Sequence, residues 1–452
     1  MRLERPIRTV RRFRIEKSDL LLTVAFHTLG CKVNQYDSEA MLEAFQNAGY
    51  TAVSFSDKAD VYVVNTCTVT GTGDKKSLQL SRRCLRLHPE SQLIVAGCLA
   101  QRMGKELLKM GARLVIGTQN RSQVVKLYEK AMAENLRICA VSALENAVYE
   151  PLTVLAQEER TRATLKIQEG CDRFCTYCII PSVRGPIRSR PLDDVVKEAK
   201  TLSENGYPEL VLTGIHLSSY GRDLTENVDL SDVITALNRL PHVKRIRLGS
   251  LEPNLITEAF MQKISQCEKL CPQFHPALQS GCDTVLHRMG RRYNITMFEK
   301  AVQHIRNAYP HAALTTDIIA GFPGETEEEH QATLETLKKI GFAKVHVFPY
   351  SIREGTKAAS FPGQLEKRVK ERRAHEIAAI GEESAEIYRQ SFIGKTCPVL
   401  FETPQEGYTP EYIRVEAANG VAGQIQDVII TKTIQDGLYG ERSNKNERLL
   451  IL

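Results

Sequence analysis

The sequence has no apolar run approaching the roughly 18 residues that a helix needs to cross a lipid bilayer. Its longest early apolar segment, residues 20–26, is shorter than the core of a typical signal peptide, and no small-residue cleavage site follows it. Long internal repeats and low-complexity tracts are also missing, which excludes a repeat architecture. We therefore expect a cytoplasmic protein with no membrane partner.

Neither sign of charge is in large excess, since charged residues make up 25% of the chain and the net charge is +6. This mild basic excess fits contact with nucleic acid but does not demonstrate it. A dense basic stretch occupies the start, and we expect residues 1–20 to form a disordered basic extension rather than a transit peptide. The remaining chain, with 42% hydrophobic residues overall, is typical of two or three globular domains.

Cysteine is abundant, with twelve residues in a chain that lacks a secretion signal. Thiols stay reduced in the cytosol, so clustered cysteines there bind metal or perform redox chemistry more often than they form disulfides. Three of them follow predicted strands in residues 21–148, namely Cys31 after strand 22–30, Cys67 after strand 60–66 and Cys98 after strand 92–97. Helical patterns follow at 38–48, 75–87 and 104–110, which predicts a parallel sheet with functional residues at the carboxyl ends of its strands.

After a polar linker at 149–162, residues 163–390 contain six strand candidates, each followed by a helical pattern. The strands are 164–169, 209–213, 245–250, 273–279, 314–320 and 344–350, and the helices begin near Leu192, Leu230, Leu255, Thr296, Thr326 and Leu365. Six such units predict a partial parallel (β/α)6 barrel with its site at the carboxyl ends of the strands. Residues 391–452 alternate in short segments (396–401, 412–416 and 423–432), which predicts a small all-β barrel. The predicted fold class is therefore α/β with a C-terminal all-β domain.

The strongest local motif, Cys171-x-x-x-Cys175-x-x-Cys178, directly follows the first barrel strand. It offers three thiolates, the usual ligands of iron–sulfur clusters, and leaves one iron of a 4Fe-4S cluster open for a small molecule. A zinc site with a distant fourth ligand, or three unrelated core cysteines, are the alternatives. With Tyr177 before its last cysteine, this loop resembles the signature of the radical S-adenosylmethionine (SAM) superfamily. The resemblance implies that the open iron chelates SAM, whose one-electron reduction yields methionine and a 5′-deoxyadenosyl radical.

Cys31, Cys67 and Cys98 occupy equivalent positions and also suggest a cluster with an open iron, although three buried structural cysteines are an equally weighted interpretation of the spacing alone. The surrounding residues Gly30-Cys31-Lys32-Val33-Asn34, Asn65-Thr66-Cys67-Thr68 and Gly97-Cys98-Leu99-Ala100-Gln101 resemble the methylthiotransferase family. That resemblance covers most of the chain after residue 20. It implies an auxiliary 4Fe-4S cluster that handles sulfur, a radical SAM barrel and a C-terminal domain similar to the RNA-binding TRAM module.

Within that family, the form Gly-Cys-Lys-Val-Asn-Gln-Tyr-Asp-Ser-Glu resembles members that act on N6-threonylcarbamoyladenosine at position 37, next to the tRNA anticodon. The resemblance implies addition of SCH3 to carbon 2 of the base, with two 4Fe-4S clusters, SAM as cofactor and an external electron donor such as flavodoxin. Members that act on isopentenyladenosine, or on an aspartate of a ribosomal protein, are the nearest alternatives. A non-catalytic iron–sulfur protein for RNA binding or electron transfer is an alternative of another class.

Further polar and small residues end the barrel strands and are candidates for a SAM pocket. With Tyr177 they are Thr213, Gly214, Ser250, Glu252, Gln279 and Asp317, and no catalytic residue is assigned beyond the cluster ligands. The glycine-rich run 321–325 lacks the Lys-Ser/Thr ending of a phosphate-binding loop, so a nucleoside triphosphatase is rejected. Pro276 within a strand would remove one ladder donor.

We expect tRNA, through its anticodon loop, as the partner, and no DNA. Candidate phosphate contacts are the basic groups on the helices near residues 75–87 and 365–373, together with Arg288, Arg291 and Arg292. A solvated helix face is an equal alternative for any single group. Tyr350 and Tyr408 are candidates for stacking on splayed bases.

Overall fold

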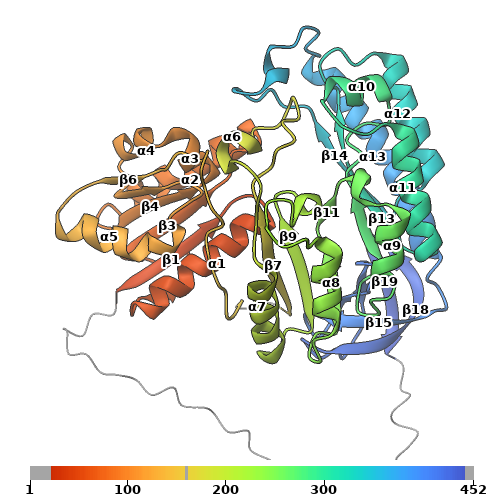
Figure 1. The fold of residues 1–452 in the computed structure, drawn as a ribbon, viewed down its shortest axis with the longest axis horizontal. Helices are drawn as coiled ribbons and strands as arrows, with labels where there is room; N and C mark the ends of the chain where they lie inside the picture. The colour runs from red at the N-terminus through yellow and green to blue at the C-terminus, as the bar shows by residue number, and fades with distance from the viewer. Residues whose placement is uncertain (1–21, 158–160, 443–452) are drawn as a thin grey trace, which may run out of the picture.

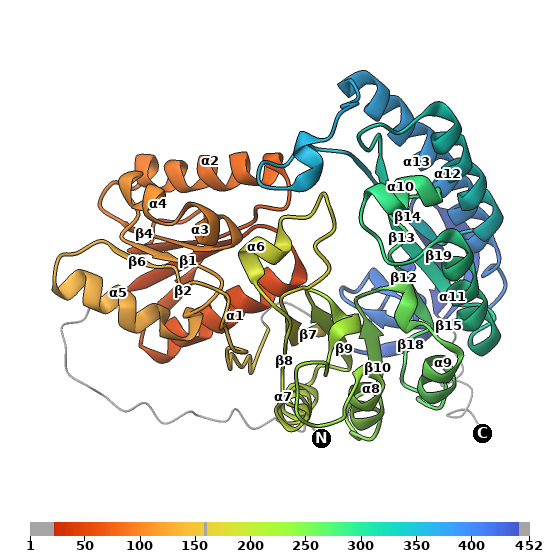
Figure 2. The ribbon, with the colours of Figure 1, turned by 45° about the horizontal axis from the view of Figure 1, so that its top comes forward.

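The computed structural model describes residues 22–157 and 161–442, which form three units in chain order (Figure 1). The predicted basic extension at 1–20 lies outside the described residues. Among the described residues, no helix is both long and apolar enough to span a membrane. Figure 2 shows the first sheet beside the barrel strands, with the short helix α6 (Ile180–Arg184) between them.

The N-terminal unit is a six-stranded parallel sheet in the order β2-β1-β3-β4-β5-β6. Its strands are β1 (Thr23–Thr28), β2 (Thr51–Val53), β3 (Val61–Thr66), β4 (Gln92–Gly97), β5 (Leu114–Ile116) and β6 (Ile138–Ala140). Its helices are α1 (Lys32–Asn47), α2 (Gly71–Leu87), α3 (Cys98–Met103), α4 (Lys105–Lys109), η1 (Arg121–Gln123) and α5 (Val124–Ala133). Helices α1 and α5 pack on one face, and α2, α3 and α4 on the other, because both faces of the central strands are apolar.

The central unit, residues 161–390, is an open half-barrel that contains the six predicted parallel strands. They are β7 (Arg162–Glu169), β9 (Glu209–Gly214), β10 (Arg245–Leu248), β12 (Gln273–Pro276), β13 (Ala313–Ala320) and β14 (Lys344–Pro349). Two short strands join them: β8 (Arg188–Ser189) pairs antiparallel with β7, and β11 (Ser250–Leu251) pairs parallel with β12. The outer helices are α7 (Leu192–Glu204), η2 (Leu217–Ser219), α8 (Leu230–Asn238), η3 (Pro253–Leu255), α9 (Glu258–Ile264), α10 (Asp283–Arg288), α11 (Ile295–Ala308), α12 (Glu327–Ile340), η4 (Lys357–Ser360) and α13 (Lys367–Gln390).

Pro276 is tolerated because it is the last residue of β12. It still contributes its carbonyl, which accepts a hydrogen bond from Thr316 Oγ1 at 2.8 Å. The missing N–H therefore leaves no gap inside the strand ladder.

The C-terminal barrel is closed by five strands in the order β15-β16-β17-β19-β18, as expected for a TRAM-like module. They are β15 (Thr396–Phe401), β16 (Glu406–Tyr408), β17 (Arg414–Glu416), β18 (Ile425–Ile434) and β19 (Gly437–Arg442). This barrel packs under the amino ends of the half-barrel strands (Figure 1). There Arg245 and Arg247 donate to the Pro398, Tyr408 and Pro410 carbonyls at 2.6–3.0 Å. The α/β fold class with its all-β end is confirmed, and the exact domain boundaries stay a prediction.

Candidate active site

The cysteines of the N-terminal unit lie together at one edge of its sheet. Cys31 directly precedes α1, Cys67 follows β3 and Cys98 opens α3. The strands before these cysteines are β1, β3 and β4, which are neighbours in the sheet. Thr28 of β1 pairs with Asn65 of β3, and Thr66 of β3 pairs with Gly97 of β4. Burial raises the pKa of the Cys98 thiol to about 11, and the Cys31 and Cys67 sulfurs contribute to that rise. The fold therefore brings the three sulfurs close enough to influence one another.

Asn34, on the first turn of α1, holds this edge together. Its Nδ2 donates to the carbonyls of Leu29 at 2.7 Å and Thr66 at 2.9 Å, which ties the ends of β1 and β3. Its Oδ1 lies 4.0 Å from Cys98 Sγ. The backbone around the sulfurs is thus fixed by buried hydrogen bonds.

The motif cysteines occupy the loop after β7, at the mouth of the half-barrel. Burial raises the pKa of Cys171 to about 11 and that of Cys178 to about 12, and neighbouring motif sulfurs add to both shifts. Thr176 pins the loop, because its N–H donates to the Met289 carbonyl at 2.9 Å and its hydroxyl donates to the Arg288 carbonyl at 2.9 Å. This loop is therefore held against the turn between α10 and α11.

Arginines donate to one sulfur in each trio. Arg184 Nε lies 3.2 Å from Cys98 Sγ, and Arg291 Nη1 lies 3.2 Å from Cys175 Sγ. Thiolates are the ordinary ligands of iron–sulfur clusters, and hydrogen bonds to their sulfurs are a usual feature of such sites. Both donor sets fit clusters of this kind.

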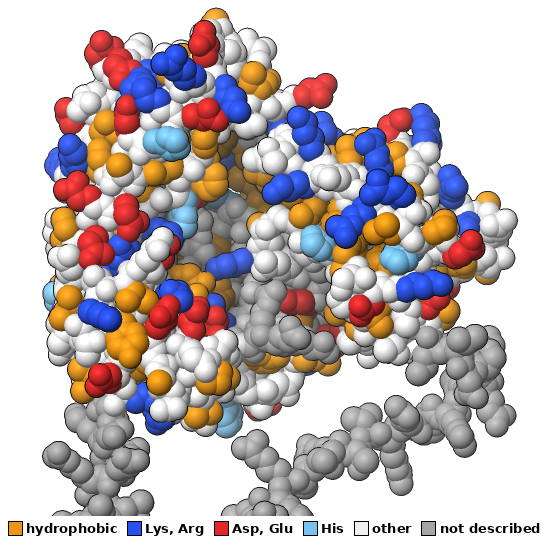
Figure 3. All heavy atoms as spheres, turned by 180° about the vertical axis from the view of Figure 1, so that it is seen from behind, with side chains coloured by type: hydrophobic (Ala, Val, Ile, Leu, Met, Phe, Trp, Pro, Cys, Tyr) orange, Lys and Arg blue, Asp and Glu red, His pale blue; other side chains and the backbone are white. Residues whose placement is uncertain are grey.

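Arg353, in the loop after β14, connects the two edges. Its guanidinium donates to Asp74 Oδ2 at 2.6 Å and to Thr68 Oγ1, beside Cys67. Five residues later the Ala358 N–H donates to the Thr176 carbonyl at 2.8 Å, beside Cys175. One short strap, residues 353–358, therefore contacts residues next to a cysteine of each trio, Thr68 beside Cys67 and Thr176 beside Cys175. From behind, the surface is hollowed between the N-terminal unit and the half-barrel (Figure 3).

The predicted SAM-pocket residues lie along the carboxyl ends of the barrel strands. Glu252 is buried and accepts from Arg173 Nε at 2.8 Å, which links it to the motif loop. Burial opposes ionisation of Glu252, but His216 and Arg173 lower its pKa to about 2, so it is a carboxylate at neutral pH. Thr213 and Gly214 end β9, and Ser250 begins β11. Asp317 lies in β13, where its carbonyl accepts a hydrogen bond from the Gln279 N–H. Tyr177 packs edge-on against Phe322.

Gly214 and Asp317, two of the residues predicted to line the SAM pocket, have neighbours that the sequence did not indicate. A side chain at Gly214 would meet Gln168, with Cβ 2.9 Å from the Gln168 Oε1, so a protein side chain already occupies this space. Asp317 lies beside two histidines that the sequence did not single out. His275 Nε2 is 3.3 Å from Asp317 Oδ2, and His346 completes a group whose ligand atoms lie within 4.8 Å of one another.

Some candidate RNA contacts are wrong. Tyr350 is buried and packs against Phe322, so its ring is not available for stacking on a base. In α13, Lys370 and Arg373 are buried, and Arg373 pairs with Glu325 at 2.7 Å, whereas Lys367, Arg368 and Arg372 are exposed and stay candidates. The basic face of α2, in contrast, is exposed: Lys75, Lys76, Arg82, Arg83 and Arg86. Figure 3 shows Lys and Arg side chains gathered on this unit.

Two protein families match this chain, and each matched range contains one of the two cysteine trios. Residues 23–117 match the Uncharacterized protein family UPF0004, and residues 165–337 match the Radical SAM superfamily. The solved radical SAM methyltransferase TsrM from Kitasatospora setae has a similar fold, with a TM-score of 0.57 and 12% identity over 75% of this chain and 77% of that chain.

Two curated relatives span nearly the whole chain. Threonylcarbamoyladenosine tRNA methylthiotransferase MtaB of Bacillus subtilis is 41% identical over 92% of this chain and 95% of its own length. A tRNA-2-methylthio-N(6)-dimethylallyladenosine synthase of Alkaliphilus oremlandii is 33% identical over 84% of this chain and 82% of its own length. The protein described here therefore belongs to the radical SAM tRNA methylthiotransferase family.

Proposed function

We propose that this methylthiotransferase adds SCH3 to carbon 2 of N6-threonylcarbamoyladenosine at position 37 of tRNA. The observation that carries the substrate is the identity of 41% to a relative named for threonylcarbamoyladenosine, against 33% to one named for dimethylallyladenosine. The sequence after the first cysteine, beginning with Lys32, agrees with this choice.

Two 4Fe-4S clusters are proposed, one held by Cys171, Cys175 and Cys178 and an auxiliary cluster held by Cys31, Cys67 and Cys98. The raised thiol pKa values indicate that cluster assembly displaces protons from buried sulfurs. When bound and supplied with an electron by a donor such as flavodoxin, the clusters and SAM provide the radical and sulfur chemistry that an inert C–H bond requires.

The chain's own contribution is placement. Parallel strands bring each trio to a carboxyl edge, and the strap 353–358 joins the two edges beside Cys67 and Cys175. Glu252, Asp317 and the other strand-end groups are proposed to hold SAM near the motif loop. A fixed distance between the two trios lets substrate carbon and sulfur meet without a large motion.

The tRNA is proposed to contact the exposed basic face of α2 and the C-terminal barrel. Helix α2 begins four residues after Cys67, so phosphates bound along it lie near the auxiliary site. Binding through lysine and arginine weakens steeply as salt concentration rises.

The decisive test is nucleoside mass spectrometry of tRNA from cells that lack the gene. Methylthio-threonylcarbamoyladenosine should disappear and return with the wild-type gene. Unchanged levels of this nucleoside, with loss of the methylthio-isopentenyl form or of a modified ribosomal-protein aspartate, would assign the substrate of a sibling enzyme.

A second test distinguishes a radical SAM enzyme from a non-catalytic iron–sulfur protein. Anaerobically purified protein should contain about eight iron and eight sulfide per chain, as two 4Fe-4S clusters require. Reduced protein mixed with SAM should release 5′-deoxyadenosine. A non-catalytic iron–sulfur protein would leave SAM intact.

A further inference from the structure

Arg184 is a buried arginine whose every side-chain nitrogen has a partner. It ends α6 and has no exposed surface. Its Nη1 donates to Asp37 Oδ2 at 3.1 Å and to Glu169, while Nη2 donates to Asn34 Oδ1. The single N–H on Nε donates to Cys98 Sγ at 3.2 Å. A guanidinium so far from water is costly unless its partners are ideally placed, so this arrangement is specific.

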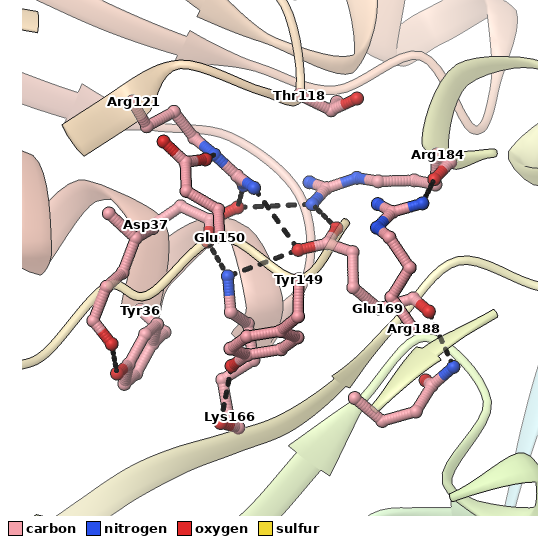
Figure 4. A network of polar contacts seen from close by, with 12 residues as sticks. Tyr36, Asp37, Thr118, Arg121, Tyr149, Glu150, Lys166, Glu169, Arg184 and Arg188 are labelled. Carbon is pink, nitrogen blue, oxygen red and sulfur yellow. Dashed lines mark hydrogen bonds and ion pairs between the residues drawn. The ribbon is translucent and has the colours of Figure 1, made fainter. Parts of the chain in front are cut away.

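The network around Arg184 joins the N-terminal unit to the half-barrel (Figure 4). Asp37 lies on α1, whereas Glu169 ends β7, two residues before Cys171. Lys166 Nζ bridges them, at 2.6 Å from Asp37 Oδ1 and 3.1 Å from Glu169 Oε2. These contacts leave the guanidinium of Arg184 little freedom to turn away from the sulfur.

The cations labelled in Figure 4 differ in their partners. Arg121, Lys166 and Arg184 pair with the Asp37 and Glu169 carboxylates, whereas Arg188 donates to the Arg184 and Pro186 carbonyls. Among these cations, Arg184 is the one with a hydrogen bond to a cysteine sulfur.

We propose that Arg184 is a positioning residue for the auxiliary cluster, donating an N–H···S hydrogen bond from Nε to Cys98 that favours the reduced state. The inference rests on the proposed function, since it takes Cys31, Cys67 and Cys98 as the cluster ligands. Reduction adds one electron from a low-potential donor, and no bond in the protein forms or breaks. A cationic donor stabilises the more negative state more than the less negative one, which raises the reduction potential.

The first arm of the test isolates the auxiliary site in the full-length chain. Cys171, Cys175 and Cys178 are replaced together by alanine, and the protein is reconstituted anaerobically with iron and sulfide. About four iron per chain are expected, as one 4Fe-4S cluster requires. A protein without iron would contradict the proposed ligand set rather than the role of Arg184.

The second arm compares variants in that background by titration with dithionite, followed by electron paramagnetic resonance. Arg184→Met removes every N–H donor at this position. The double variant R184M/E169Q also removes one carboxylate, which keeps the charge balance of the network and guards against misfolding. In both, the ratio of reduced to oxidised cluster at a fixed potential should fall at least tenfold, which corresponds to about 59 mV for a one-electron couple.

Arg121→Gln is the matched control. Arg121 is equally buried and contacts Asp37, Glu150 and Glu169, but it donates to no sulfur among the described residues. Its removal should change the ratio much less than tenfold. The inference is overturned by iron-loaded Arg184 variants with unchanged potential, by an equal shift in R121Q, or by loss of iron from both Arg184 variants, which would assign Arg184 a purely structural role.

Discussion

At the scale of single residues, Gly97 shows how one backbone position places a sulfur. Its φ is +91°, and a Cβ there would lie 2.3 Å from Asn65 Oδ1 and 2.7 Å from the Thr66 carbonyl oxygen. Because Cys98 follows directly, a side chain at position 97 must displace the end of β4. We predict that Gly97→Ala lowers iron from about eight to about four per chain, measured after anaerobic reconstitution.

Gly206→Ala is the control for this change. Gly206 also has a positive φ, of +98°, but a Cβ there meets nothing within 4 Å. Its substitution introduces backbone strain without a collision, so full iron content is expected. Equal iron loss in both variants would attribute the effect of G97A to general destabilisation.

Lys32 is the residue-scale candidate for recognising the substrate. It begins α1 next to Cys31, and part of the residue is exposed. Burial of its ammonium, followed by the charges of Arg162 on β7 and Arg247 on β10, lowers the pKa of Lys32 to about 8. Threonylcarbamoyladenosine carries a carboxylate that this cation can pair with.

We therefore predict that Lys32→Gln lowers kcat/KM for threonylcarbamoyladenosine tRNA about tenfold, the size expected for one lost charged hydrogen bond. Steady-state kinetics with modified tRNA measures it. Lys105→Gln, at an exposed position on α4, serves as control. Identical kinetics for K32Q and wild type would remove Lys32 from substrate recognition.

The six proposed cluster cysteines stand out in the sequence because each follows a predicted strand or forms a short motif. The contacts of Arg184 and Arg291 with cysteine sulfurs could not be predicted, since a lone arginine has no characteristic spacing. Their roles depend on α6 and on the turn after α10 folding back onto the cysteine loops. The histidines beside Asp317 were missed for the same reason, because they come from β12 and β14.

At the scale of elements, the strands of the half-barrel were predictable, whereas several shorter strands were not. All six parallel barrel strands overlap segments that the sequence predicted as strands, and the β15 segment 396–401 matches its prediction. Strands β2, β5, β6 and β16 have three residues each, which is too short for a periodic pattern. Helix α1 begins at Lys32 rather than near Ser38, because the polar first turn hides its start.

The start of α12 gives an element-scale prediction. Thr326 and Glu329 form a reciprocal cap, and Arg288 of α10 donates to Glu329 Oε2 at 2.6 Å. The bond from Arg288 outweighs burial and lowers the pKa of Glu329 to about 2. This ionised carboxylate therefore stabilises the fold above its unfolded pKa of about 4.3, and the contribution fades as pH falls towards 2.

Glu329→Gln should accordingly lower the thermal unfolding midpoint at pH 7, and the gap to wild type should narrow as pH falls below about 4.3. Differential scanning fluorimetry across pH measures both. Glu335→Gln, an exposed change further along α12, should leave the midpoint unchanged. A gap that is constant with pH would contradict the assigned ionisation.

At the scale of the whole molecule, the strap 353–358 couples the two cysteine edges. Arg353 is 4% exposed and bridges from the half-barrel to Asp74 and Thr68 of the N-terminal unit. We predict that Arg353→Ala keeps both clusters but uncouples them, so that SAM is cleaved with less methylthio transfer. The ratio of 5′-deoxyadenosine to methylthio product, measured by mass spectrometry, should rise severalfold.

Arg102→Ala is the matched control for the strap. Arg102 binds the same Asp74 carboxylate at 2.5 Å from within the N-terminal unit, and its contact with the strap is limited to a 3.9 Å ion pair with the exposed Glu354. Its loss should change the product ratio much less than the loss of Arg353. Equal ratios in the two variants would mean that Asp74 alone, and not the connection between the units, matters.

The docking of the C-terminal barrel has a consequence for engineering chimaeras. Arg162 and Arg247 lie over the Tyr412 ring at 4.8 Å and 4.6 Å, and Arg247 also pairs with buried Glu209. A foreign C-terminal barrel joined at α13 would leave these cations facing water or mismatched carbonyls. Successful transplants between homologues will therefore have to carry the receiving surface of β7, β9 and β10 along with the module.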